Sequence, residues 1–421
     1  MNHRTISRFA ILAALALHAG GSLAQSTGSA GAAGYQYSTF SALSSPVTLP
    51  GMAPGTEPDW VTGMGLSLGG IIFPHVHVDS VYGTATRDQE ELRVGHHDPV
   101  RRDGITVQNL EFSISGRINE YHEFFITYAG PIGEGDSFDG IVEEWFWKFK
   151  NLPGNVELRA GRVYNRFGIQ NTYHPHGFDW VDQYLVNGRI LGDDSLTTIG
   201  AELSWRAPLP WTSQFDVALG VAPEHEAHDH GGFTGQYSAE ESHFAVNRVL
   251  GVANWTNVYN YNDFHQFRAG LSGAWGENHS GYQTSIYGAH FEYQWRENGF
   301  EAGGRYFRVR SEAMFNRYKV EDELGLVLDP VTQQDFGCYV SMLYGLPNNL
   351  ELGLRGEYVP GNGETVQDAR LRVSPGVTWY ANANRNLRLR LQYNYDHSNA
   401  YGSDHGIWAQ VSLTWGGPEV R

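Results

Sequence analysis

Histidine and acidic residues gather at several places in this chain of 421 residues, and the densest group is the run 224–230. It packs three imidazoles and three carboxylates into seven residues. Imidazole nitrogen and carboxylate oxygen are suitable ligands for zinc, copper or nickel. The run is therefore a candidate site for a divalent metal such as Zn²⁺, and a solvated acidic loop is the interpretation we favour; no cofactor is expected to be required. The candidate metal ligands are His225, Glu226, His228, Asp229 and His230.

Three smaller groups of histidines are His96-His97-Asp98 in a predicted loop, the pair His174 and His176, and the pair His75 and His77. His75 and His77 are two residues apart, so they lie on the same face of a predicted strand. His75 and His77 are both candidate metal ligands. The interpretation we favour for this pair is a polar interior wall without metal.

Arginine recurs at alternate positions of three consecutive segments in the last fifth of the chain. Side chains at alternate positions of a strand share one face, and neighbouring strands lie about 4.8 Å apart. The five guanidinium groups are therefore expected to form one basic patch, made by Arg355, Arg370, Arg372, Arg388 and Arg390.

Acidic residues are placed where they can oppose this basic patch. They are Glu143 and Glu144 in one predicted strand, and Asp179, Asp182, Asp193 and Asp194 in a long connection. If that connection folds inward, the opposed charges create a field across a pore, and such lining charges set selectivity. The predicted pore lining is the five arginines with Glu144, Asp179 and Asp182. The alternative is that the arginines pair with Glu351, Glu357 and Asp396 and only fill a polar interior.

The elements that must position these residues are long strands with alternating polarity. In the segment 386–396, Leu387, Leu389 and Leu391 share one face, and Arg388 and Arg390 share the other. A period of two with one apolar face is typical of a half-buried strand. Sixteen such segments are predicted, near 71–83, 105–117, 121–129, 141–150, 155–164, 196–206, 213–221, 249–258, 264–276, 283–296, 299–310, 335–345, 349–359, 369–380, 386–397 and 406–415.

Many of these apolar faces end in tyrosine or tryptophan, and short turns alternate with long loops along the chain. Both features are typical of transmembrane barrels, which carry aromatic girdles and have short periplasmic turns and long outer loops. The predicted fold is therefore all-β, a transmembrane antiparallel β-barrel of about 16 strands. The last predicted strand ends at Trp415, and the six-residue tail 416–421 after it departs from barrels that stop at this aromatic.

Composition narrows the classes of protein that remain. The chain has 18% charged and 13% aromatic residues, 51 glycines and a formal net charge of -17. Its mean hydropathy is -0.39, and no long apolar run follows the first 24 residues, which excludes a bundle of membrane helices. The single cysteine, Cys338, excludes a disulfide framework and a cysteine-based zinc site. The acidic balance disfavours nucleic acid as a partner.

The first residues predict export and divide the chain into three parts. Residues 1–24 have two arginines, then an apolar stretch too short to span a bilayer, then small residues at the end. This pattern is typical of a secretory signal peptide. Residues 25–62 are rich in Gly, Ser, Ala, Thr and Pro and are interpreted as a flexible periplasmic leader. Residues 63–421 are the predicted barrel, and the expected location is the outer membrane of a Gram-negative cell.

With this strand pattern, residues 71–415 resemble the porins of Gram-negative outer membranes, including the phosphate-selective type. The stretch Gly161 to Gly168, followed by His174 to Asp182, is similar to a segment of porin-like proteins that are linked by name to zinc. The resemblance implies an outer-membrane channel. We expect this channel to serve passive diffusion of small hydrophilic solutes or ions, with divalent metal (zinc) as the favoured specific cargo. The resemblance also implies outer-membrane lipid, lipopolysaccharide and the barrel-assembly machinery as partners. Many porins of this size are homotrimers, and the sequence leaves that question open.

Two other classes of function are alternatives to a channel. A barrel hydrolase would need a His/Asp site in the loops, for which Asp98, Asp179 and Asp229 are candidates. No Gly-x-Ser-x-Gly segment is present. An adhesin or purely structural barrel would be favoured by one dominating large extracellular domain, and the strand pattern shows none. The chain is therefore expected not to be an enzyme.

Overall fold

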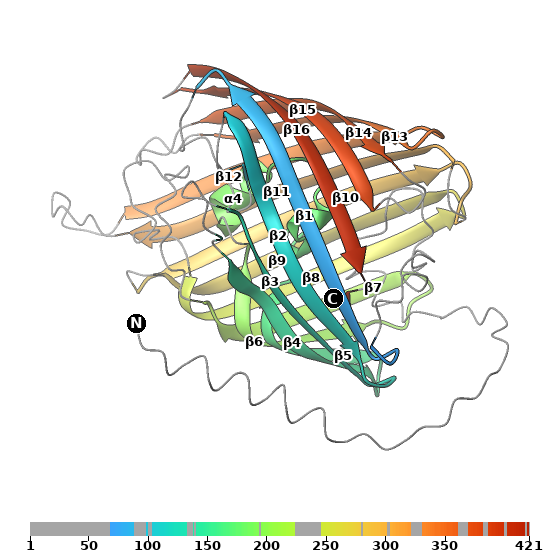
Figure 1. The fold of residues 1–421 in the computed structure, drawn as a ribbon. Coiled ribbons are helices and arrows are strands. Elements are labelled where there is room, and N and C mark those ends of the chain that lie inside the picture. The colour runs from blue at the N-terminus through green and yellow to red at the C-terminus, as the bar shows by residue number, and fades with distance from the viewer. Residues whose placement is uncertain are drawn as a thin grey trace, which may run out of the picture. The chain divides into compact units, whose positions relative to one another are not determined.

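The computed structural model describes residues 68–87, 98–99, 103–132, 138, 140–192, 195–223, 246–278, 281–300, 304–320, 331–360, 369–381, 386–399, 402–416 and 419–420. Within them, sixteen antiparallel strands close into one barrel, which confirms the predicted fold class. Each strand pairs with its neighbours in sequence, and β1 also pairs with β16 to close the ring (Figure 1). Among the helices of the described chain, none is long and apolar enough to cross a membrane.

The strands are β1 Ile72–Ala85, β2 Gly104–Arg117, β3 His122–Gly130, β4 Ile141–Leu152, β5 Val156–Tyr164, β6 Thr197–Arg206, β7 Thr212–Val221, β8 Val246–Asn262, β9 His265–Asn278, β10 Gln283–Arg296, β11 Tyr306–Val320, β12 Val331–Gly345, β13 Leu350–Val359, β14 Arg370–Tyr380, β15 Leu387–Ser398 and β16 Gly402–Gly416. Between β5 and β6 lie the 3-10 turns η3 Gln170–Thr172 and η4 Pro175–Gly177 and the short helix α4 Leu185–Leu191. These three elements belong to the predicted long connection after the fifth strand.

One strand differs clearly from its prediction. The segment predicted at 299–310 is β11, which runs from Tyr306 to Val320. The apolar face weakens after Val309 because Ser311, Ala313 and Arg317 occupy the outward positions. Pairing with β12 nevertheless continues to the end of the strand. Backbone hydrogen bonds between neighbours therefore extended this strand where the polarity pattern could not show it.

The two faces of the wall differ in polarity, as alternation along each strand requires. On β15, Leu391 is 55% exposed on the outside, whereas Arg390, Gln392 and Asn394 are buried on the inside. Trp145, Trp147, Trp205, Trp379 and Trp415 are also exposed on the outer surface. The barrel thus has an apolar, aromatic exterior and a polar interior.

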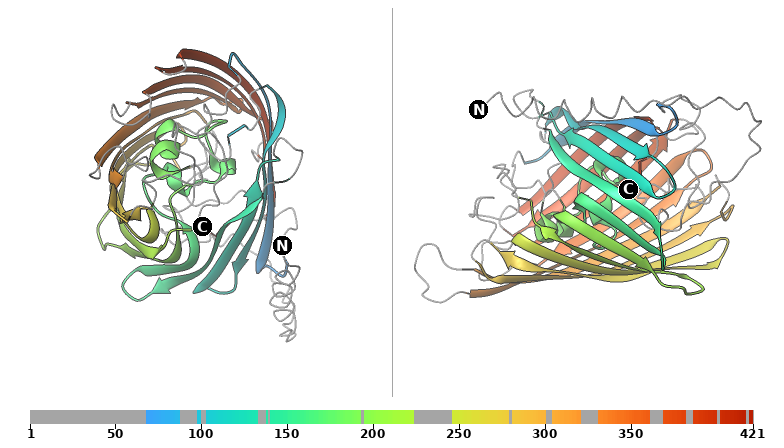
Figure 2. Two further views of the ribbon diagram at one scale, coloured as in Figure 1. Left: turned by 90° about the vertical axis from the view of Figure 1, so that its left-hand side faces the viewer. Right: turned by 90° about the horizontal axis from the view of Figure 1, so that it is seen from below.

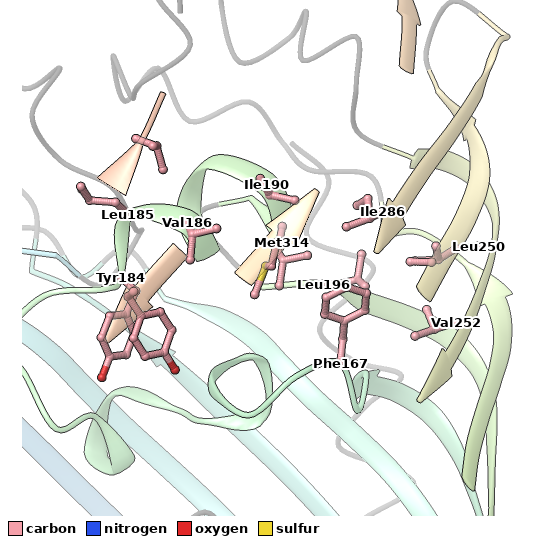
Figure 3. Packing of buried hydrophobic residues seen from close by; sticks show 14 of the residues in the cluster. Phe167, Tyr184, Leu185, Val186, Ile190, Leu196, Leu250, Val252, Ile286 and Met314 are labelled. Atoms are coloured by element: carbon pink, nitrogen blue, oxygen red, sulfur yellow. The ribbon is translucent and has the colours of Figure 1, made fainter. Parts of the chain in front are cut away.

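The connection between β5 and β6 lies inside the barrel (Figure 2). From it, Phe167, Leu185 and Val186 pack with apolar side chains that strands β8 to β13 turn inward (Figure 3). The rings of Tyr184 and Tyr339 stack with centroids 3.6 Å apart. An apolar cluster inside the barrel therefore fixes one part of this connection to the wall.

Residues after β16 also reach the interior. Val420 is 4% exposed and belongs to a cluster with Phe125, Phe146 and Val163. Its backbone N–H donates to Ser115 Oγ at 3.1 Å. Val420 is therefore packed within the barrel, and the neighbouring Glu419 lies with its Oε1 3.4 Å from Nδ1 of His75 on β1.

Candidate functional site in the barrel interior

The predicted basic patch exists as a feature of the inner wall. We call Arg355, Arg370, Arg372, Arg388 and Arg390 the arginine wall; they come from β13, β14 and β15. Arg355 is fully buried, and Arg370, Arg372 and Arg390 are 2–4% exposed. Strand pairing places Arg372 beside Glu357 and Asp396 on the two adjacent strands.

The arginine wall is neutralised partly by carboxylates of its own strands. Arg370 Nη2 lies 2.8 Å from Asp396 Oδ1, and Arg372 Nε donates to the same oxygen at 2.9 Å. Arg355 Nε lies 2.9 Å from Glu357 Oε1. These contacts are those expected if the arginines fill a polar interior.

The inward connection supplies the remaining counter-charge through Asp182. Its carboxylate accepts from Arg355 Nη2 at 2.6 Å and from Arg372 Nη1 at 2.7 Å. Gln392 and Asn394 of β15 donate to it as well, at 2.6 and 2.7 Å. Burial opposes ionisation of Asp182, but Arg355 and Arg372 outweigh it and hold the pKa of this carboxyl below its usual value. Asp182 therefore binds the connection to the arginine wall as a carboxylate.

Asp179 makes a second contact of the same kind with another part of the wall. Its two oxygens accept from Arg308 Nη2 at 2.5 Å and from Arg310 Nη1 at 3.1 Å, both on β11. Burial raises the pKa of Asp179, yet the two guanidinium groups prevail and lower it. Asp179 and Asp182 thus both face arginines, in direct ion pairs.

The last two members of the arginine wall bind backbone oxygens. Arg390 Nη2 donates to the carbonyl of Phe178 at 2.9 Å, and Arg388 Nη1 donates to the same carbonyl at 3.2 Å. Arg388 Nη2 also donates to Ser412 Oγ. Guanidinium groups therefore hold both the side chains and the backbone of the connection between residues 178 and 182.

The local sequence turns the chain inward at the start of this connection. Gly168 has a left-handed φ of +65°, and a Cβ there would lie 2.0 Å from Glu312 Oε2. Glu312 Oε1 accepts from the backbone N–H of Gln170 at 2.7 Å. Just before, Arg166 is buried and lies 2.6 Å from Glu202. Glycine is favoured here because side chains with a Cβ rarely adopt this left-handed φ.

A second charged group is formed by residues of β1, β2 and β4, of the connection between β5 and β6, and of the segment after β16. We call it the imidazole–carboxylate cluster, and its members are His75, His77, Asp79, Glu111, Glu143, Glu144, His174, His176 and Glu419. His174 Nδ1 lies 2.7 Å from Glu143 Oε2, and its Nε2 lies 3.0 Å from Glu144 Oε2. His77 Nε2 lies 2.9 Å from Asp79 Oδ2. The sequence pairs His75 with His77 and His174 with His176 thus come together in one place.

His176 lies at the centre of this cluster, on the turn η4. Its Nδ1 is 3.0 Å from Glu111 Oε2, and its Nε2 is 3.3 Å from Glu419 Oε2. Burial disfavours the charged ring, but Glu111 and Glu419 outweigh burial and raise the pKa of His176 to about 10. The ring of His176 is also 5.3 Å from that of His75 and 5.4 Å from that of His77. The protonated ring of His176 therefore places a positive charge of the connection among these carboxylates.

Of the remaining predicted residues, some lie in the barrel interior and others lie outside the described residues. Glu144 belongs to the imidazole–carboxylate cluster, where its Oε1 accepts from the backbone N–H of Tyr164 at 2.7 Å. Asp98 is buried and accepts from the backbone N–H of Gln183 at 2.7 Å. The run 224–230, with the proposed ligands His225, Glu226, His228, Asp229 and His230, lies outside the described residues, as do His96, His97, Asp193 and Asp194.

Sequence reasoning missed four functional candidates: Glu111, Glu419, Arg308 and Arg310. Glu111 shares its strand face with Ser113 and Ser115, so its inward position was readable from the alternation of β2. Arg308 and Arg310 alternate with Phe307 and Val309 in the same way. Glu419 gave no such signal because it follows the last strand.

No family model matches the sequence. An uncharacterized protein of Aquifex aeolicus is 26% identical over 116 residues, which are 28% of this chain and only 24% of that relative's length.

Solved structures resemble the chain over most of its length. An anion-selective porin from Comamonas acidovorans has 10% identity and a TM-score of 0.51, covering 82% of this chain and 99% of the porin. The outer membrane channel DcaP of Acinetobacter baumannii has 10% identity and a TM-score of 0.52, covering 82% of this chain and 96% of the channel. At this identity the likeness concerns the fold: the chain has the sixteen-stranded barrel of Gram-negative outer-membrane porins.

Proposed function

We propose that this protein is an outer-membrane channel for passive diffusion of small hydrophilic solutes and ions, and not an enzyme. The observation that carries the proposal is the charged interior, into which the connection between β5 and β6 folds. A barrel of sixteen strands is wide enough to hold an aqueous passage. A segment inside the barrel narrows that passage and brings charged groups close to the solute.

The inner faces of the strands around the connection between β5 and β6 differ in charge. Arginines dominate the inner face of β13 to β15, while carboxylates and imidazoles dominate that of β1, β2 and β4. Asp179 and Asp182 form their ion pairs with arginines, so much of the positive charge of the wall is compensated. The imidazole–carboxylate cluster combines the ligand types that transition metals prefer. Divalent metal ions, zinc included, are accordingly the specific cargo that we propose.

Flux measurements test the transport proposal. Purified protein in liposomes is expected to admit sugars and ions in a swelling assay, and to admit Zn²⁺ to an enclosed fluorescent indicator. Protein denatured by heat before reconstitution is the control. A folded, reconstituted barrel that passes none of these solutes would contradict the proposal, and turnover in parallel lipid and peptide hydrolysis assays would favour an enzyme.

The cellular setting is part of the proposal. Export is expected to remove residues 1–24 and to deliver the chain to the outer membrane, with lipopolysaccharide and the barrel-assembly machinery as partners. Residues 1–67 lie outside the described part of the chain. Sequencing the N-terminus of protein isolated from outer membranes tests the cleavage. Cross-linking in those membranes tests whether the protein forms a homotrimer.

A further inference from the structure

We propose that His75, Glu111 and Glu419 form a binding site for a divalent transition-metal ion inside the barrel. These residues come from β1, from β2 and from the tail after β16. One ligand atom from each lies within 4.8 Å of the others. None of the three residues belongs to the run 224–230, and the site does not depend on conduction, so it extends beyond the proposed channel function.

The spacing of the donor atoms suits a metal. His75 Nδ1 lies 3.4 Å from Glu419 Oε1, which is longer than a usual charged hydrogen bond. Two ligand atoms bound to one tetrahedral zinc ion at about 2.1 Å are about 3.4 Å apart. A metal can therefore lie between these two atoms with little movement of either side chain.

His75 offers an independent observation. It is 6% exposed, and its Nδ1 makes no hydrogen bond within the described residues although it points toward Glu419. A buried polar atom without a hydrogen bond is costly. Coordination of a metal ion removes this cost, since a neutral imidazole nitrogen is then a ligand.

The two carboxylates are held in position by other groups. Glu111 Oε1 accepts from Ser113 Oγ at 3.1 Å, while its Oε2 faces His176 Nδ1. Glu419 presents Oε1 to His75 and Oε2 to His176. His176 thus contacts one oxygen of each carboxylate, as outer residues of metal sites commonly do. We assign His176 as a positioning residue of the site.

The donor set defines the class of ion. One imidazole and two carboxylates neutralise a divalent cation and leave coordination positions for water or a transported ligand. Nitrogen with oxygen suits zinc, nickel or ferrous iron, whereas magnesium and calcium prefer oxygen alone. A bound ion would also join the tail to β1 and β2.

Zinc titration of the full chain in detergent tests the site. By isothermal calorimetry, wild-type protein is expected to bind Zn²⁺, and the Glu419→Gln and His75→Gln variants to bind it at least about 100-fold more weakly. His176→Gln is expected to weaken binding by about 10- to 100-fold, the range for outer-shell residues. His290→Gln is the matched control, since His290 is a buried histidine of β10 outside the cluster, and its affinity should remain that of wild type.

A variant of the run 224–230 distinguishes zinc binding by that run from zinc binding at the proposed site. A variant with alanine at His225, His228 and His230 is expected to keep the binding that depends on Glu419. Binding of Co²⁺ gives a second measurement, because its visible absorption changes when the imidazole ligand is removed in His75→Gln. Heat-dependent mobility in gels shows whether each variant has folded, and Glu419→Gln alters no strand.

Three results would overturn the proposal. They are absence of zinc binding by folded wild-type protein, wild-type affinity in both Glu419→Gln and His75→Gln, and loss of all binding in the variant of the 224–230 run. None of these results bears on flux through the barrel, so the site and the channel can fail separately.

Discussion

Replacement of Asp182 by asparagine should release the inward connection from the arginine wall. The carboxylate of Asp182 accepts four side-chain hydrogen bonds, two of them from the buried Arg355 and Arg372. Asparagine keeps one acceptor oxygen and points an NH₂ group at a donor. The variant therefore loses the ion pairs with Arg355 and Arg372 and places two donors in contact.

The magnitude follows from burial and from the contacts that remain. Removing one partner of a buried ion pair costs about 3–5 kcal/mol. Arg355 keeps Glu357 and Arg372 keeps Asp396, which places the expected loss near the lower end, at about 3 kcal/mol. A change of about 3 kcal/mol raises the population of the released connection by about 150-fold.

Amide hydrogen exchange measures this release directly. The backbone N–H groups of Val181 and Leu185 donate to Gln392 and Glu357, so they are protected while the connection is bound. Local opening sets their exchange rates. In Asp182→Asn, peptides covering 179–187 should exchange about 100-fold faster, whereas peptides from the strands should not change.

A matched variant controls for the loss of a carboxylate elsewhere. Glu297→Gln removes the contact of Glu297 with Arg305 at 2.6 Å, in the turn between β10 and β11. This exposed pair should leave exchange in 179–187 at the wild-type rate. The reasoning is refuted if Asp182→Asn folds and its 179–187 peptides also exchange at the wild-type rate.

Three further predictions concern the walls, the pH and the backbone. Replacing Arg370 and Arg388 by alanine should shift planar-bilayer ion selectivity toward cations, because positive charge is lost from the interior; unchanged selectivity would contradict a pore-lining role. The pKa of Asp182 is lowered in the folded protein, so its carboxylate stabilises the bound connection above the ordinary aspartate pKa of about 4, and this stabilisation is lost as the pH falls below it. Amide hydrogen exchange of the connection should therefore be independent of this group from about pH 5 to 8 and increase only under more acidic conditions. Gly161→Ala should lower the denaturant midpoint of the barrel, since Gly161 has a φ of +146° and its Cβ would lie 2.1 Å from a carbonyl oxygen of β4. Gly356→Ala, where a Cβ meets no atom within 4 Å, should leave that midpoint nearly unchanged.

The strands could be predicted from the sequence because their signal is local. Alternation of apolar and polar residues, as in Leu389 to Asn394, follows from one face meeting an apolar environment and the other the interior. The prediction for β11 was wrong in its bounds where outward residues became small or polar, at Ser311 and Ala313. There the neighbouring strand, not the polarity pattern, determines the length.

The charged interior could be predicted only in part. The arginine wall was readable because its members recur at alternate positions of consecutive strands. The imidazole–carboxylate cluster was not, because His75, Glu111, His176 and Glu419 are far apart in the sequence and meet only when the barrel closes. Glu419 in particular belongs to a tail that no strand pattern describes. Long-range closure and inward folding thus determine which charged groups become neighbours.

Single-channel recording tests the central claim most directly. Purified wild-type protein, shown to be folded by its heat-dependent gel mobility, is added to a planar lipid bilayer under a salt gradient. The account predicts stepwise increases in current, with a reversal potential that moves when the arginine wall is substituted. Folded protein that inserts into the bilayer and yet produces no current steps would contradict a channel.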